Sequence, residues 1–155
     1  ISNFGFAASM EHIGEKGKVS EIDRVIEIKM YDNYFEPNNI VIKKNETIKF
    51  YVTNFGTLVH EFNIATKSMH LNHQPEMLKM MENEILLVDR IDYEKMKEMA
   101  KIDHSMAHSH FNSVLLEPNQ SGEIIWKFNT EINLEAACNV PGHYESGMIV
   151  KINNY

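Results

Sequence analysis

Short segments in which apolar and polar residues alternate limit the possible fold of this chain more than any other feature. In the segment 25–30 (VIEIKM), Ile26, Ile28 and Met30 fall on one side and charged residues on the other. Such alternation predicts a strand with one buried face. Turn-forming residues separate the strands that the sequence predicts, which are 25–30, 37–46, 47–52, 58–64, 122–128, 131–138 and 148–152. Many short strands predict an all-β sandwich or barrel.

The stretch 66–112 interrupts this pattern with residues that favour helix. Pro75 is expected at the first position of a helix over 74–83, where its missing N–H costs nothing. Asp92 is expected to cap a second helix over 92–102. We therefore predict a mainly helical and looped insertion, rich in methionine and histidine, between two strands of the sandwich.

Length and composition agree with a single domain over 1–155, with a loosely held N-terminal arm at 1–18. The chain has 155 residues, of which 43% are apolar and 24% charged, and these values suit a globular protein. A formal charge of −7 argues against nucleic acid as a partner. No apolar run approaches the ~20 residues that a membrane-spanning helix needs. Because the chain begins at Ile1 rather than Met, we expect that a leader or tag was removed.

The segment 136–148 (AACNVPGHYESGM) contains the only cysteine, Cys138, followed at intervals of five by His143 and Met148. An earlier predicted strand places His60 on its apolar face. A buried imidazole needs a polar partner, a thiolate needs positive charge beside it, and a metal ion supplies both. Two histidines, one cysteine and a weak axial methionine form the ligand set of a blue-copper site.

Each of these residues also has a purely structural interpretation. His60 alone suits a core or surface histidine with an ordinary hydrogen-bond partner, Cys138 an inert buried thiol, and Met148 a core residue where a strand begins. Zinc is a chemical alternative to copper, although structural zinc sites rarely use methionine. The joint occurrence of the four donors on a β-sandwich favours copper.

Histidine and methionine also crowd into two stretches of the predicted insertion. The chain has ten methionines and eight histidines, and several lie in 68–73 (SMHLNH) and 103–111 (DHSMAHSHF). Thioethers suit Cu(I) and imidazoles suit Cu(II). The residues proposed for a second copper site are His104, Met106, His108, His110, Met69, His70 and His73. The alternative is a solvated polar loop in which some of the histidines are incidental.

Three stretches of the sequence resemble those of the cupredoxins, the small blue-copper proteins that include azurins and plastocyanins. The stretch 34–62 (YFEPNNIVIKKNETIKFYVTNFGTLVHEF) is similar to the family's approach to its first histidine ligand. The stretches 115–128 (LLEPNQSGEIIWKF) and 137–152 (ACNVPGHYESGMIVKI) are similar to the C-terminal part of the family's sequences. The motif VPGHYESGM (140–148) and the Met/His-rich insertion look closest to those of the periplasmic copper-resistance cupredoxins of bacteria.

The resemblance implies a Greek-key β-sandwich that binds copper and is located in the periplasm. By this resemblance the copper ligands are His60, Cys138, His143 and Met148. Two positions depart from the family pattern. Glu61 stands where many cupredoxins have Asn, which helps to tie the ligand loops together, and Asn139 stands where Ser or Thr is common.

These observations support three hypotheses of function. The first is a blue-copper protein of copper tolerance that cycles between Cu(I) and Cu(II), with an extra copper site in the insertion. The second is a dedicated electron carrier, and the third is copper storage or chaperoning without a redox role. The sequence shows no nucleophile–base pair and no phosphate-binding loop that would indicate a hydrolase or transferase. Oxidation of Cu(I) is the one enzymatic activity that the hypotheses include. The expected partners are copper ions and a redox partner protein or copper exporter, and a monomer is expected.

Overall fold

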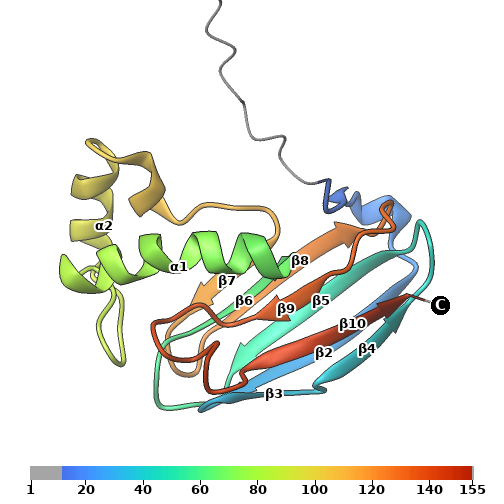
Figure 1. Ribbon diagram of the computed structural model, residues 1–155, viewed down its shortest axis with the longest axis horizontal. Helices are drawn as coiled ribbons and strands as arrows, with labels where there is room; N and C mark the ends of the chain where they lie inside the picture. Colours follow the sequence, from blue (N-terminus) through green and yellow to red (C-terminus); the bar gives the residue numbers. More distant parts are fainter. Residues whose placement is uncertain (1–11, 155) are drawn as a thin grey trace, which may run out of the picture.

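The computed structural model describes residues 12–154, which form two five-stranded β-sheets packed face to face (Figure 1). The first sheet has the order β1 (Glu15–Lys16), β8 (Ser121–Lys127), β5 (Thr47–Asn54), β2 (Arg24–Tyr31) and β3 (Tyr34–Glu36). The second has the order β4 (Asn39–Ile42), β10 (Ile149–Asn154), β9 (Glu135–Ala137), β6 (His60–Ala65) and β7 (Ser113–Leu116). The predicted β-sandwich is confirmed.

The chain crosses repeatedly between the two sheets. It leaves the first sheet after β3, adds β4 to the second and returns for β5. Two strand pairs are consequently parallel, β2 with β5 and β4 with β10, while the remaining pairs are antiparallel. This crossing brings strands that are far apart in the sequence, such as β6 and β9, side by side.

The main core fills the space between the sheets with the faces that alternation predicts. Ile48, Phe50 and Val52 of β5 have no exposed surface. The Phe50 ring lies 5.4 Å from that of Phe62 in β6 and 6.1 Å from that of Phe128, measured between ring centroids. Aromatic pairs at these separations add to the stability that apolar burial provides.

Three strands have no signal in the sequence pattern. Strands β1, β3 and β7 contain two, three and four residues, and none of the predicted strands covers them. The strand predicted at 37–46 is shorter in the structure, where β4 ends at Ile42 and a turn with Asn45 at φ 62° leads into β5.

The first 11 residues of the predicted N-terminal arm lie outside the described residues. From residue 12 onward the chain is attached to the first sheet. Strand β1 pairs with β8, and the indole N–H of Trp126 donates a 3.0 Å hydrogen bond to the carbonyl of Ile13. A short 3-10 helix, η1 (Val19–Glu21), then leads toward β2. The described part of the arm is therefore held in place.

The insertion between β6 and β7 contains α1 (Lys67–Glu82), α2 (Tyr93–Ala100) and a 3-10 helix, η2 (His104–Ala107). Helix α1 lies beside the second sheet, and α2 lies beyond the end of the sandwich (Figure 1). The predicted start of the first helix is wrong, because α1 begins at Lys67 and Pro75 lies inside it. Thr66 supplies the N-cap, since its side chain accepts a hydrogen bond from the N–H of Met69. Pro75 is exposed, so water can satisfy the carbonyl that its ring leaves without a donor.

The insertion has a small core of its own. Met77 and Met80 of α1 and Met106 of η2 have no exposed surface, and they pack with Ile85 and Leu86. The predicted cap of α2 is confirmed, because the Asp92 carboxylate accepts a 3.0 Å hydrogen bond from a backbone N–H one turn later. Within 12–154, neither helix combines the length and apolar character needed to cross a membrane.

Candidate metal centre

Strand β6 is buried along its whole length, and its alternate residues face two different environments. His60, Phe62 and Ile64 point to one side, and Phe62 and Ile64 belong to the main core. Glu61 and Asn63 therefore point to the other side, where α1 covers the sheet. The sequence predicts the inward direction of His60 correctly, but it gives no reason to expect that Glu61 has no exposed surface.

The three predicted ligands His60, Cys138 and His143 come together where β6 begins and β9 ends. The Cys138 Sγ lies 3.8 Å from His60 Nδ1 and 3.4 Å from His143 Nδ1, and the two Nδ1 atoms are 3.2 Å apart. Metal bonds of about 2.0 Å to nitrogen and 2.3 Å to sulfur would separate three coplanar ligands by roughly 3.5–3.7 Å. The triangle of donors therefore has the dimensions of a trigonal metal site.

The loop after β9 holds this triangle closed. Gly142 has φ +88°, a left-handed conformation that glycine adopts without strain, and the His143 N–H donates to the carbonyl of Val140 at 2.9 Å. Met148 is fully buried, and its N–H donates to the His143 carbonyl at 3.1 Å. Its own carbonyl accepts from the Cys138 N–H at 3.2 Å. The backbone of Met148 thus joins the loop that carries the other two donors.

Burial sets the ionisation of this centre. It raises the pKa of the Cys138 thiol to about 12, against the opposing hydrogen bond from the Glu61 N–H to Sγ at 3.2 Å. Burial, with the adjacent His60, lowers the pKa of His143 to about 4. At neutral pH His143 therefore offers a lone pair, while the thiol keeps its proton until a cation displaces it.

Asp32, in the turn between β2 and β3, orients His60 and is absent from the sequence prediction. His60 Nε2 lies 2.9 Å from Asp32 Oδ1, so Nε2 carries the hydrogen and Nδ1 is left for a metal. Burial opposes ionisation of Asp32, but hydrogen bonds from Thr57, His60 and Leu58 lower its pKa to about 2. Gly56 permits this contact, because a Cβ there would lie 2.3 Å from Asp32 Oδ1.

A second group of possible metal donors lies on the other side of β6. It contains Glu61, His73 of α1 and His108, whose ligand atoms all lie within 4.8 Å of one another. Both histidines contact the same carboxylate oxygen, Glu61 Oε2, through Nε2, and for His73 the distance is 3.1 Å. The ring centroid of His110 lies 5.6 Å from that of His108. We refer to Glu61, His73 and His108 as the outer triad.

The other histidines and methionines proposed for a second copper site lie outside the outer triad. His104 is exposed in η2, and Met106 is buried in the insertion core. Met69 packs against the main core. His70 lies 3.0 Å from the Asn139 amide and 3.3 Å from the carbonyl of Glu135, so ordinary hydrogen bonds account for it.

Glu61 and Asn139, the two departures from the family pattern, contact each other. The Asn139 side-chain amide donates to Glu61 Oε1 at 3.0 Å. This contact ties the residue after His60 to the residue after Cys138. The sequence indicates both positions as unusual, and only the structure shows that they form a pair.

Comparison with known proteins places this architecture in a family. A family model described as a cupredoxin-like domain matches residues 4–88. The copper-resistant cuproprotein CopI of Pseudomonas aeruginosa is 41% identical over 150 residues, covering 88% of this chain and 78% of that protein. The protein of the same name from Vibrio cholerae is 26% identical over 146 residues, covering 92% and 72%.

Solved structures of blue-copper proteins share the fold. Auracyanin B matches with a TM-score of 0.62 at 12% identity, over 92% of this chain and 96% of its own. An azurin from Methylomonas sp. strain J matches with a TM-score of 0.54 at 10% identity, over 86% and 98%. At such low identity these matches show the fold alone. The family model and the Pseudomonas relative carry the assignment, and the chain belongs to the cupredoxin-like family.

Proposed function

We propose that this protein serves copper tolerance by holding one copper ion in a blue-copper (type 1) site. The proposed ligands are His60, Cys138, His143 and Met148. The observation that carries the proposal is the triangle of two imidazole nitrogens and one sulfur, with edges of 3.2–3.8 Å. The relatives named as copper-resistant cuproproteins support copper as the metal.

The residues of the site suit a metal that changes oxidation state. A thiolate and a thioether favour Cu(I), while imidazole accepts both Cu(I) and Cu(II). Bound copper would supply one-electron redox chemistry. The chain keeps His60 oriented through Asp32, keeps the sulfur out of water and supplies a hydrogen bond from Glu61 to it. Tuning of this kind comes from groups around the ligands as much as from the ligands themselves.

In this proposal the insertion supplies additional copper-binding groups, and the electron released by oxidation of Cu(I) passes to a redox partner protein. A periplasmic location is part of the proposal and is supported by the resemblance to periplasmic copper-resistance cupredoxins. Two imidazoles with little exposure, His73 of α1 and His108 after η2, favour copper handling over electron transfer alone.

A second candidate is a dedicated electron carrier. His143 is half-buried and borders an apolar cavity of about 270 Å³ that Leu58 and Pro141 also line. The same cavity reaches Val88, which is 74% exposed. An apolar surface beside a proposed copper ligand would give a redox partner a short path to the metal.

Titration of the purified protein with Cu(II), followed by visible absorption and by metal counting, tests the proposal. The strong band of thiolate-to-copper charge transfer should saturate at one copper per chain. Binding of further copper without growth of this band supports copper handling, whereas one copper with fast electron self-exchange supports the carrier. Copper binding without any such band would exclude the blue-copper site.

A further inference from the structure

The outer triad is built around a carboxylate that the proposed blue-copper site does not use. Glu61 has no exposed surface, and its side chain contacts His73, His108 and Asn139. Removing a carboxylate from water costs several kcal/mol unless other groups compensate its charge. Within residues 12–154, no lysine or arginine forms an ion pair with Glu61, so the candidate cations beside it are imidazoles.

Three separate elements converge on this carboxylate. Glu61 comes from β6, His73 from α1, and His108 follows η2. The backbone of His108 adopts φ 44° and ψ 49°, a left-handed conformation that is uncommon for residues other than glycine. Such conformations persist where the surrounding structure imposes them, often at functional sites. Here the conformation directs the His108 ring to Glu61.

His73 is oriented in the same way as a metal-binding histidine. Its Nδ1 lies 3.1 Å from the carboxylate of Glu76, one turn later in α1. In the metal-free protein Nε2 carries a hydrogen toward Glu61 at 3.1 Å, and a metal ion would have to displace it. The Glu76 carboxylate would then keep the hydrogen on Nδ1 and leave the Nε2 lone pair for the metal. Asp32 does the same for His60 with the two ring nitrogens exchanged.

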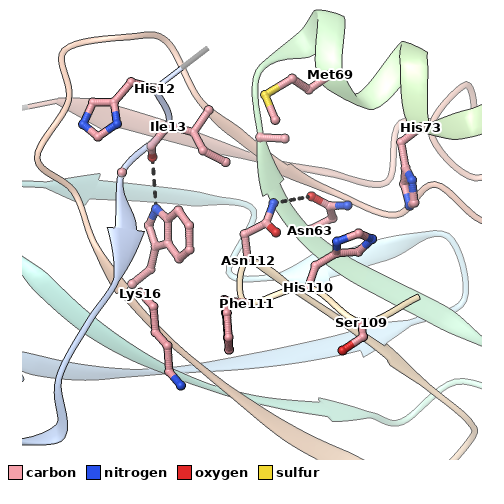
Figure 2. Close-up of a pocket in the computed structure, with 13 residues that line it drawn as sticks. His12, Ile13, Lys16, Asn63, Met69, His73, Ser109, His110, Phe111 and Asn112 are labelled. Atoms are coloured by element: carbon pink, nitrogen blue, oxygen red, sulfur yellow. Dashed lines mark hydrogen bonds between the residues drawn. The ribbon is translucent and has the colours of Figure 1, made fainter. Parts of the chain in front are cut away.

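Solvent reaches this region through a cavity of about 520 Å³. Figure 2 shows His73 and His110 on one side of that cavity, with Met69 above and Asn112 nearby. The ring centroids of His73 and His110 are 6.1 Å apart. His110 is therefore close enough to approach an ion held by the outer triad.

These observations carry a single conclusion. We propose that Glu61, His73 and His108 bind a second metal ion, with His110 available as a further ligand. Two imidazoles and one carboxylate, with no sulfur among the triad, suit a divalent transition ion such as Cu²⁺ or Zn²⁺. Cu(I) would prefer sulfur, and Mg²⁺ or Ca²⁺ would require mainly oxygen ligands.

Glu61 also connects this site to the proposed blue-copper site, and this part of the inference rests on the proposed function. Its backbone N–H donates to Cys138 Sγ, while its carboxylate holds the side chain of Asn139. A divalent ion on the carboxylate places positive charge near the sulfur. Because positive charge favours the less positive state of the copper, filling the outer triad should raise the Cu(II)/Cu(I) reduction potential.

Zn²⁺ tests the site, because it binds imidazole and carboxylate without redox chemistry. Titration calorimetry of the full chain, preloaded with one Cu(II), should show one further Zn²⁺ bound. Glu61→Gln and His73→Gln should each weaken that binding at least 10–100-fold, the loss typical even for supporting residues of metal sites. His104→Gln is the matched control, since His104 belongs to the same insertion but lies outside the outer triad, and it should bind Zn²⁺ like the wild type.

The outcomes separate the two proposals. A missing visible band together with Zn²⁺ binding that depends on His73 contradicts the blue-copper site and supports the outer triad. A normal band with equal Zn²⁺ binding in wild type and His73→Gln overturns the outer triad as a metal site and leaves it an ion-pair cluster that attaches α1. If Glu61→Gln fails to fold, His73→Gln decides, because the contacts of His73 are with Glu61, Glu76, His108 and His110 and not with the blue-copper donors. If the reduction potential of the copper stays the same when Zn²⁺ binds, the proposed connection through Glu61 is overturned.

Discussion

The two sides of β6 carry clusters that differ in chemistry and share a principle of construction. On the inner side, a thiol and two imidazoles form a triangle within the sandwich. On the outer side, a carboxylate and two imidazoles meet under the insertion. In each, a carboxylate outside the cluster fixes one imidazole, Asp32 for His60 and Glu76 for His73.

The difference lies in which part of the molecule holds each cluster together. The inner cluster depends on paired strands β6, β9 and β10 and on the main core. The outer triad also depends on α1 and on the segment after η2, which pack on the smaller insertion core. One strand therefore serves a rigid site and a site whose geometry follows the docking of an insertion. The predictions below separate the two, in decreasing order of expected effect.

Cys138→Ser should remove the inner cluster's visible band completely. A serine hydroxyl does not ionise at neutral pH and lacks the softness that a thiolate offers to copper. Binding of Zn²⁺ at the outer triad should remain, because its ligands are unchanged. Visible absorption and calorimetry on the same variant check both statements, and a surviving band would contradict the assignment of Cys138.

Met80→Ala should destabilise the insertion by about 2–5 kcal/mol, the usual cost of a cavity left by a buried methionine. We expect weaker Zn²⁺ binding at the outer triad and a normal visible band. Phe50→Ala, in the main core, is the comparison variant. It should lower the temperature at which the visible band is lost on heating. Thermal unfolding followed by circular dichroism and by absorption would show this. Equal loss of both metals in Met80→Ala would mean that the two regions unfold as one unit.

Raising the pH should weaken the metal-free protein through His73. Burial opposes its protonation, but Glu61 and Glu76 outweigh burial and raise the pKa of His73 from 6.5 to about 9. Since protonation is stronger in the folded state, this stabilisation is complete below pH 6.5 and disappears as the pH rises through about 9.

Each unit of pKa shift corresponds to about 1.4 kcal/mol, so the free energy of unfolding should fall by roughly 1–3 kcal/mol over this range. The rings of His108 and His110 also face His73. Burial and the neighbouring histidines lower the pKa of His110, so its own contribution has the opposite sign and is lost as the pH falls below 6.5. Urea unfolding at pH 6.5 and 9.5 measures the change, and His73→Gln should reduce it. If the free energy of unfolding changes as much in that variant as in the wild type, the effect belongs to other groups.

Met148→Leu should alter the inner cluster least, changing its reduction potential rather than its occupancy. An axial thioether binds weakly, and its loss favours Cu(I), so the potential should rise. A spectroelectrochemical titration measures the shift. Complete loss of copper would mean that Met148 holds the metal more strongly than an axial ligand, and an unchanged potential would mean that it is not a ligand.

Much of the sandwich was predictable because alternation is a local property. The faces of β5 and the inward direction of His60 follow directly from side chains that alternate along a strand. The cap at Asp92 is equally local. Pro75 misled the prediction of α1, because a proline suits the first turn of a helix but is tolerated inside one at an exposed position.

The sequence by itself predicted the proposed copper ligands, since Cys138, His143 and Met148 lie on one short loop and His60 on a recognisable strand. Only the tertiary structure decided that Glu61 is buried and which histidines reach it. Glu61, His73 and His108 are separated by 12 and 35 residues, and nothing local relates them. The docking of α1 on β6 and the left-handed turn at His108 bring them together. Packing between distant elements sets the distances among these three residues, and a local sequence pattern does not.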